Sequence, residues 1–326
     1  MKASRSGAGS SPRFPMAIAL IGLLIAAVLS PCPVSAATAK AKQRTFASPE
    51  AAVQALMDTL RKEDKTGLSA IFGPGSETVV SSGDEVMDRA ARDRFLKEYA
   101  EKNSLDRAGE DKVILQVGVD DWPFPIPIVR MGTTWRFDAA AGKVEILNRR
   151  IGANELKVID VLHAYVAAQR EYVSRDRQGA GVYAYAQRIA STPGKKDGLY
   201  WEAARGEEPS PLGPLAAEAA REGYAKADRT RSAVPFHGYY FHILKAQGRH
   251  APGGRYSYVV KGNMILGFAM VAYPARYGSS GIMTFVVNQD GVVYQKDFGK
   301  DTAKVAGQIK TYDPDASWKR AEPAAK

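Results

Sequence analysis

One stretch of the sequence, residues 148–173, constrains the fold more than any other. Its large, mostly apolar side chains recur at spacings of three and four, which places them along one side of a helix. Asn154 is placed to cap this helix, and Gly152 to end whatever precedes it. A helix this apolar on one side needs a partner, so we expect the strands that follow to wrap around it. The predicted stripe consists of Leu156, Ile159, Leu162, Tyr165, Val166, Gln169, Tyr172 and Val173.

The amino-terminal residues have the order of a secretory signal peptide. The basic residues Lys2, Arg5 and Arg13 precede an apolar run over residues 16–29, and small residues follow at 34–36. That order predicts cleavage after Ala36. The apolar run is shorter than the roughly 20 residues that span a bilayer. We therefore expect a signal peptide at residues 1–36, a flexible leader at 37–44, and a periplasmic or secreted mature chain without a membrane span.

Cysteine content and charge exclude several classes of function. Cys32 is the only cysteine, and it lies inside the predicted signal peptide. The mature chain then has no thiol, which excludes disulfides, a cysteine nucleophile and thiolate metal sites. Loss of the signal's three basic residues lowers the formal net charge from +10 to +7. The remaining basic residues are scattered, and no glycine-rich loop leads into a lysine, so neither nucleic acid nor nucleotide phosphate is an expected ligand.

Residues 45–147 are expected to form an amino-terminal domain of helices and a small antiparallel sheet. Ser48, Pro49 and Glu50 have the cap, first-turn proline and first-turn acid of a helix start. Three alternate prolines in residues 120–127 cannot donate ladder hydrogen bonds, so they predict an edge or a rigid connector. The other predicted elements are helices at 65–72 and 84–103 with Ala90 facing inward, an alternating strand at 113–119 with Val119 buried, and a hairpin at 128–138.

Residues 148–318 are expected to form the second domain, followed by a tail at 319–326. Residues 288–291 contain asparagine, aspartate and glycine, which accept the left-handed backbone of a hairpin turn. The expected fold class is therefore α+β, with the long helix packed on an antiparallel sheet. The predicted elements are short helices at 183–189, 215–223 and 302–309, and strands at 238–244, 255–260, 264–273, 281–288 and 291–296.

Several segments carry a resemblance to known families. DDWPFPIP, EILNRRIGANE, STPGKKDGLYW, SPLGPL, HGYYF, YGSSGIMTF and VNQDGVVYQKDFG resemble, in this order, segments of the domain-of-unknown-function family 2950 of secreted bacterial proteins. This resemblance implies an exported bacterial protein and supplies no catalytic residues. Residues 154–297, with AYVAAQREY, GYYFHIL and VAYPARYGSSGIMTF, are similar to the heads of type IV pilins and pseudopilins, which implies a pilin-head-like second domain. The chain lacks the pilin assembly helix and its processing site, which disfavours a role as a pilus subunit.

No motif in the sequence predicts a metal site or a cofactor. His237 and His242 are an odd number of residues apart, so in one strand they point to opposite faces and cannot share a metal. Ser279 and Ser280 lie in YGSSG, which is not the G-x-S-x-G spacing of a nucleophile elbow. The adjacent acids Glu207 and Glu208 are expected to be solvated.

The expected function is a non-catalytic binding or assembly module whose surface is lined by an aromatic loop. Aromatic rings stack on sugars or on partner side chains while charges orient polar groups, so the partner is expected to be an envelope protein or a glycan. The predicted binding residues are Lys195, Asp197, Tyr200, Trp201, Tyr239 and Tyr277.

The alternative is a cell-envelope hydrolase with its acids and a histidine in a cleft between the two domains. Such an enzyme brings at least two of these groups within about one hydrogen bond of each other or of a shared water. The candidate catalytic residues for this alternative are Asp120, Asp121, Glu155, Asp197 and His237.

Overall fold

The computed structural model describes residues 43–177, 179, 181–224 and 234–321. These residues all belong to one unit of the chain, Lys40–Lys326. The predicted signal peptide with Cys32 lies outside the described residues, as do most of the predicted leader and of the predicted tail. The described residues form helices and antiparallel sheets, so the expected α+β class is confirmed.

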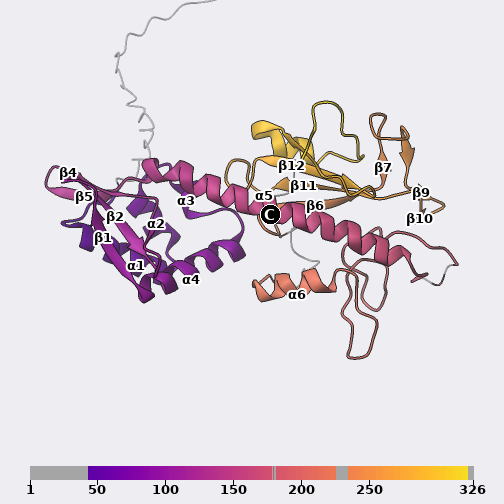
Figure 1. Ribbon diagram of the computed structural model, residues 1–326, viewed down its shortest axis with the longest axis horizontal. Helices are drawn as coiled ribbons and strands as arrows, with labels where there is room; N and C mark the ends of the chain where they lie inside the picture. Colours follow the sequence, from indigo (N-terminus) through magenta and orange to yellow (C-terminus); the bar gives the residue numbers. More distant parts are fainter. Residues whose placement is uncertain (1–42, 178, 180, 225–233, 322–326) are drawn as a thin grey trace, which may run out of the picture. The chain divides into compact units, whose positions relative to one another are not determined.

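The first half of the chain packs helices against a small antiparallel sheet (Figure 1). In chain order its elements are α1 (Pro49–Arg61), α2 (Lys65–Phe72), α3 (Glu77–Val80), α4 (Glu85–Glu101), β1 (Asn103–Arg107), β2 (Lys112–Val117), β3 (Trp122–Pro123), β4 (Ile128–Met131) and β5 (Thr134–Phe137). The sheet has the order β1-β2-β4-β5, and the short strand β3 pairs with the end of β2. The predicted hairpin is formed by β4 and β5.

Local sequence signals explain where these helices begin. The Ser48 hydroxyl accepts a hydrogen bond from the Ala51 N–H, and Pro49 occupies the first helical position of α1, as predicted. Asp64 caps α2 in the same way through the Gly67 N–H (2.8 Å). Side-chain caps of this kind stabilise a helix by about 1 kcal/mol each.

The core of the first half lies between α1, α2 and the sheet. Val113, Leu115 and Val117 of β2 are all buried, which confirms the predicted alternation. Val119 is 71% exposed because β2 ends at Val117, so its predicted burial is wrong. Ala90 is also exposed rather than inward-facing, because α4 buries none of its side chains completely.

Helix α5 (Ala139–Val173) is longer than predicted, and it runs unbroken through Gly152. The Asp138 carboxylate caps it by accepting a hydrogen bond from the Ala141 N–H (3.3 Å). The predicted stop at Gly152 is wrong because one glycine inside a helix costs only about 1 kcal/mol relative to alanine. The buried neighbour Ile151 shows that the helix is packed at this point.

The predicted stripe of α5 faces the second core. Leu162 and Val166 are buried and Ile159 is partly buried against this core, as predicted. Leu156 is 47% exposed, so its place in the predicted stripe is wrong. Asn154 is not a cap, because its side-chain amide instead donates to a backbone carbonyl of the second half.

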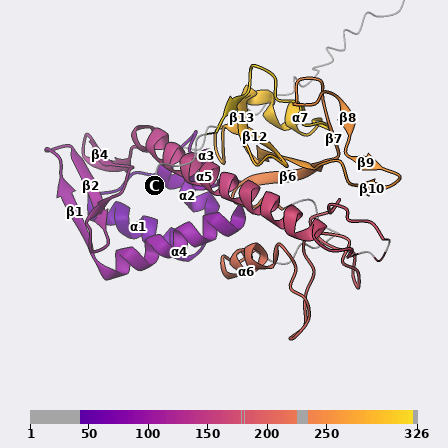
Figure 2. The same cartoon turned by 45° about the vertical axis from the view of Figure 1, so that its right-hand side comes forward.

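The second half builds a five-stranded antiparallel sheet beside α5, and Figures 1 and 2 show β6 and β12 along this helix. Its order is β14-β13-β12-β11-β6. The elements after α5 are α6 (Gly213–Arg221), β6 (Tyr239–Leu244), β7 (Ala246–Gln247), β8 (Tyr256–Ser257), β9 (Val259–Val260), β10 (Asn263–Met264), β11 (Ala269–Pro274), β12 (Met283–Asn288), β13 (Tyr294–Asp297), η1 (Gly299–Asp301), α7 (Thr302–Ala306) and β14 (Lys319–Arg320).

The predicted helix at residues 183–189 is wrong. This segment has no helical assignment, and Tyr185 instead forms a bridge to Met264 of β10. The buried amide of Gln169 accepts from the Ala186 N–H (2.9 Å) and donates to the Ala186 carbonyl (2.8 Å). These bonds to α5 take the place of the bonds that a local helix would form.

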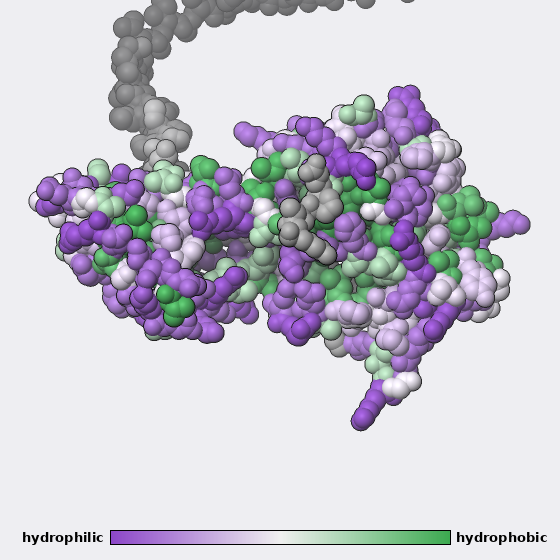
Figure 3. Space-filling model, viewed as in Figure 1, coloured by the Kyte–Doolittle hydropathy of each residue, from purple (hydrophilic) through white to green (hydrophobic). Residues whose placement is uncertain are grey.

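Apolar side chains reach the surface over the β9–β10 hairpin, at the right of Figure 3. The exposed residues there include Val260, Ile265 and Leu266. Among the described residues, no helix is long and apolar enough to cross a membrane.

Candidate functional site

Trp201, the centre of the predicted aromatic surface, is packed in the second core. Its side chain is only 8% exposed, and the indole N–H donates to the Glu208 carbonyl (3.1 Å). The Lys196 ammonium lies 5.3 Å and the Arg177 guanidinium 5.9 Å from the ring centre. The ring therefore holds together the loop that runs through residues 196–208, and it has little surface left for a ligand.

Glu208 is the charged counterpart of this tryptophan. Its carboxylate accepts hydrogen bonds from Arg175 (2.9 Å), Arg177 (3.1 Å) and Lys196 (3.2 Å). Partial burial alone would raise the pKa of Glu208, but the Lys196 hydrogen bond and the three positive charges lower it overall. The expectation that Glu208 is merely solvated is therefore wrong.

The other predicted loop residues serve local structure or lie exposed. Asp197 accepts hydrogen bonds from the Thr192 N–H (2.6 Å) and hydroxyl (2.7 Å). Although burial opposes it, these bonds lower the pKa of Asp197. Lys195 is exposed in the same turn, and Tyr200 is half-buried with its N–H bonded to the Ile189 carbonyl (2.8 Å).

The two tyrosines predicted to complete the surface lie elsewhere. Tyr239 is fully buried, and its hydroxyl donates to the Met283 carbonyl (3.1 Å) while its ring packs on Phe285. The Tyr277 hydroxyl donates to the Asp297 carboxylate (3.3 Å). Because Trp201 and Tyr239 are core residues, the six predicted binding residues do not share one exposed surface.

The candidate catalytic residues of the hydrolase alternative are also held apart. Asp120 is exposed, and Asp121 pairs with Lys102 (2.7 Å) in the turn after β2. Glu155 accepts hydrogen bonds from the N–H groups of Ile282 and Met283, each at 2.9 Å. Within the described ranges, no hydrogen bond or ion pair joins any two of Asp120, Asp121, Glu155, Asp197 and His237.

His237 belongs to a partly buried polar group that we call the Asp84 cluster, defined by Asp84, Glu222, Tyr224, His237 and Gly238. The Asp84 carboxylate accepts hydrogen bonds from the Tyr224 hydroxyl (2.7 Å) and the Gly238 N–H (2.9 Å). Its other oxygen caps α4. Sequence reasoning identified Asp84 only as a helix start, because its second set of partners lies 140 or more residues away.

Burial shifts the titration of the Asp84 cluster. It raises the pKa of Tyr224, and the hydrogen bond to Asp84 raises it further. Burial lowers the pKa of His237, although the Glu222 carboxylate, 3.4 Å from the imidazole, acts in the opposite direction. The cluster is thus a set of satisfied hydrogen bonds with a neutral histidine, which is a structural arrangement.

A concave site lies in the first half, where the predicted rigid connector leaves the sheet. Strand β3 pairs with the end of β2, and β4 pairs with its start, so residues 124–127 are separated from the ladder. From this segment the Phe124 N–H still bonds β2, and it donates to the Leu115 carbonyl (2.7 Å). The prolines cannot form such bonds because they lack the N–H.

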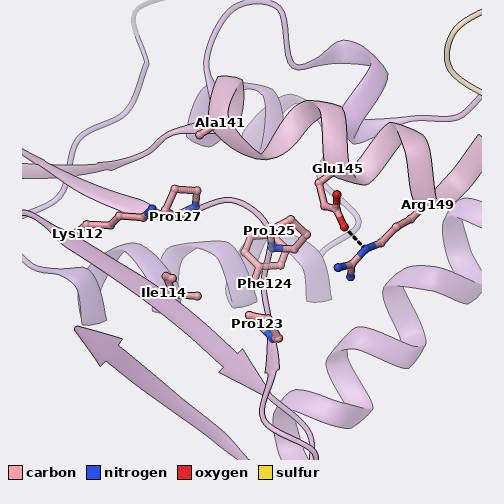
Figure 4. Close-up of a pocket in the computed structure, with 9 residues that line it drawn as sticks. All are labelled: Lys112, Ile114, Pro123, Phe124, Pro125, Pro127, Ala141, Glu145 and Arg149. Atoms are coloured by element: carbon pink, nitrogen blue, oxygen red, sulfur yellow. Dashed lines mark hydrogen bonds and ion pairs between the residues drawn. The ribbon is translucent and has the colours of Figure 1, made fainter. Parts of the chain in front are cut away.

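Helix α5 covers the gap that this segment leaves, and the resulting pocket has a volume of about 290 Å³. Figure 4 shows the proline segment between β2 and α5, with the Glu145–Arg149 ion pair (2.5 Å) at the edge. We call this site the proline pocket. It is lined by Lys112, Ile114, Pro123, Phe124, Pro125, Pro127, Ala141, Glu145 and Arg149.

Gly142 allows α5 to approach the proline segment. A Cβ atom at this position would lie 2.5 Å from the Pro125 carbonyl oxygen and 2.8 Å from Ile126. Contacts this short with backbone atoms force a shift, so glycine is required by the close approach rather than by its φ angle. This role of Gly142 was not predicted, because the sequence does not show that Pro125 lies against it.

The described residues contain no group of three or more His, Cys, Asp and Glu side chains that could hold a metal ion.

The architecture defines an α+β protein with one long helix shared by two cores. The model of a family described as a protein of unknown function (DUF2950) matches residues 43–321. The chain belongs to this family, because the match covers well over half of its length. No curated protein and no solved structure matches the chain. The similarity of the second half to pilin heads stays a prediction.

Proposed function

We propose that this protein is an exported, non-catalytic binding or assembly module of the cell envelope, and that its partner binds at the proline pocket. The observation that carries the proposal is a concave site, of which one wall is a segment stiffened by three alternate prolines. Proline fixes φ, so the wall at Pro123, Pro125 and Pro127 loses little conformational entropy when a partner binds. Preformed, partly apolar concavities with a few polar groups are typical binding sites.

The lining predicts the kind of partner. Ile114, Phe124 and the proline rings offer apolar surface, while Lys112 is exposed at the edge. A volume of about 290 Å³ is at the lower limit of small-molecule sites and suits one inserted side chain. We infer a protein partner that inserts an apolar side chain next to a carboxylate, which meets the Lys112 ammonium.

The hydrolase alternative has less support. Glu155 and Asp197 accept backbone hydrogen bonds that hold loops in place, so each carboxylate already has a structural role. A general base needs free access to a substrate proton.

Filling the proline pocket tests the proposal. Ala141 lines the pocket, whereas Val144 is an exposed residue of the same helix outside the lining. We expect Ala141→Trp to weaken partner binding about tenfold, equivalent to about 1.4 kcal/mol, and so to reduce recovery of the partner from envelope extract. Val144→Trp should leave recovery unchanged, and thermal unfolding of both variants checks the fold. Equal recovery of the partner with both variants would contradict binding at the proline pocket.

Export is supported by the order of basic, apolar and small residues at the amino end. We expect the protein recovered from the periplasm or the medium to begin at Ala37, because signal peptidase cleaves after such small residues. Intact-mass measurement checks this. Recovery of a chain that still begins at Met1 would contradict it.

A further inference from the structure

A second concave site lies on the outer face of the second sheet. Tyr239 and Phe285 pack together on the face of the sheet that contacts α5, since the Tyr239 hydroxyl reaches Glu155 of that helix. Val286 follows Phe285 and therefore points to the opposite face. Lys296 lies directly across from Thr284 in the register of β12 and β13, which places it on this outer face too.

The outer face is hollowed beside Lys296, and the pocket has a volume of about 360 Å³. One wall comes from the end of β13 and the residue after it, and the other comes from the segment after α7 and from Trp318, which precedes β14. We call this site the lysine–aromatic pocket. It is lined by Val286, Lys296, Phe298, Gln308, Ile309, Lys310, Thr311, Asp313 and Trp318.

Two aromatic rings meet at Lys296. Phe298 and Trp318 pack edge to face, with ring centres 5.7 Å apart at 80°. The Lys296 ammonium lies 5.0 Å from the Phe298 ring centre and 6.0 Å from that of Trp318. Both rings are only partly buried, unlike Trp201 and Tyr239, so they retain surface that a ligand can contact.

The charge of the lining is positive. Lys296 and the exposed Lys310 carry two positive charges, and Asp313 is the acid of the lining. Asp313 is already engaged, because its carboxylate accepts from the His250 N–H (2.7 Å) and pairs with the His250 imidazole (3.1 Å). The Lys296 ammonium donates one bond to the Ser317 hydroxyl (2.6 Å), which leaves two of its three protons.

We propose that the lysine–aromatic pocket binds an acidic sugar. A pyranose ring has an apolar face that packs on aromatic rings, and the pocket is large enough for one or two sugar units. The sugar's carboxylate or phosphate meets Lys296 and Lys310, since a charged hydrogen bond to an ammonium is about twice as strong as a neutral one. Gln308 and Thr311 supply partners for hydroxyl groups.

This inference is independent of the proline pocket, because it concerns other residues, another sheet and another ligand. A module that binds a protein at one site and an acidic glycan at the other would link the two in the envelope. The Ala141→Trp variant should therefore bind acidic sugars like the unchanged protein.

The test is a titration of the mature chain, followed by NMR of the Trp318 indole N–H signal. The probes are trigalacturonic acid, the neutral trisaccharide maltotriose, glucose 6-phosphate and inorganic phosphate. We expect trigalacturonic acid or glucose 6-phosphate to bind at least ten times more tightly than maltotriose, and the better of the two identifies the charged group. Equal affinity for maltotriose, equal affinity for inorganic phosphate, or the absence of saturable binding would overturn the proposal.

Matched lysine variants assign the effect to the pocket. Lys296→Met keeps the aliphatic stem and removes the charge, so we expect it to abolish the preference for acidic over neutral sugars. Lys304→Met changes an exposed lysine of α7 outside the lining and should retain the preference. Trp318→Phe keeps an aromatic ring and identifies the NMR signal. A preference that survives Lys296→Met and Lys310→Met would contradict the assignment.

Discussion

The two concave sites of this chain are built by different means. In the first half, three alternate prolines remove backbone donors, so a segment leaves the ladder and α5 covers the gap. In the second half the sheet is complete, and side chains on its outer face form the site. The shape of the proline pocket is therefore set by the backbone, whereas the chemistry of the lysine–aromatic pocket is set by side chains.

The largest effect on stability is expected at Asp84, because its carboxylate caps α4 in the first half and accepts hydrogen bonds from the second half. We expect Asp84→Ala to lower the free energy of unfolding by about 3 kcal/mol, since it removes a helix cap and leaves the buried Gly238 N–H and the partly buried Tyr224 hydroxyl without an acceptor. Urea unfolding followed by circular dichroism measures this. Asp84→Asn keeps an oxygen acceptor and should lose less. A loss below about 0.5 kcal/mol in Asp84→Ala would show that the cluster carries little stability.

Substitutions at two glycines of α5 test whether the backbone shapes the proline pocket. We expect Gly142→Ala to destabilise the protein by about 2 kcal/mol, because its methyl group meets the Pro125 carbonyl. Gly152→Ala has open space around it and should stabilise the same helix by up to about 1 kcal/mol. Thermal or chemical unfolding of both variants gives the comparison. The same sign of change at both positions would refute the close approach at Gly142.

The smallest effect is expected from pH at the Asp84 cluster. Burial lowers the pKa of His237 below its ordinary value of 6.5, so the unfolded chain binds the proton more tightly than the folded chain. The stability from neutral His237 is thus fully present above about pH 6.5 and is lost as pH falls through the lower folded pKa. His237→Asn suits the left-handed backbone at φ 48° and removes this titration. Unfolding free energies measured at several pH values should fall more steeply for the unchanged protein, and parallel curves would contradict this.

Local signals in the sequence predicted the local parts of the fold. Ser48 and Pro49 mark the start of α1 because a cap needs only residues within one turn. The alternation of Val113, Leu115 and Val117 predicted β2 because strand faces repeat every two residues. The alternate prolines likewise predicted an edge or a rigid connector, although not the helix that covers it.

The features that could not be predicted depend on contacts that no local pattern in the sequence indicates. Gln169 bonds the backbone of Ala186, which replaces the helix expected at residues 183–189. Trp201 was predicted to be a ligand-binding ring, because the sequence does not show that Lys196 and Arg177 lie over it. The contact between Lys296 and Trp318 was not predicted. It forms only because β14, which follows Trp318, pairs with β13, which contains Lys296.

Site-specific photocrosslinking in the producing cells shows whether a partner occupies the proline pocket. A photoreactive residue is placed at position 141, inside the pocket, or at position 144, outside it on the same helix. We expect a discrete covalent adduct with an envelope protein from position 141 and none of that mass from position 144. Adducts of equal yield from both positions, or an adduct from position 144 alone, would contradict it.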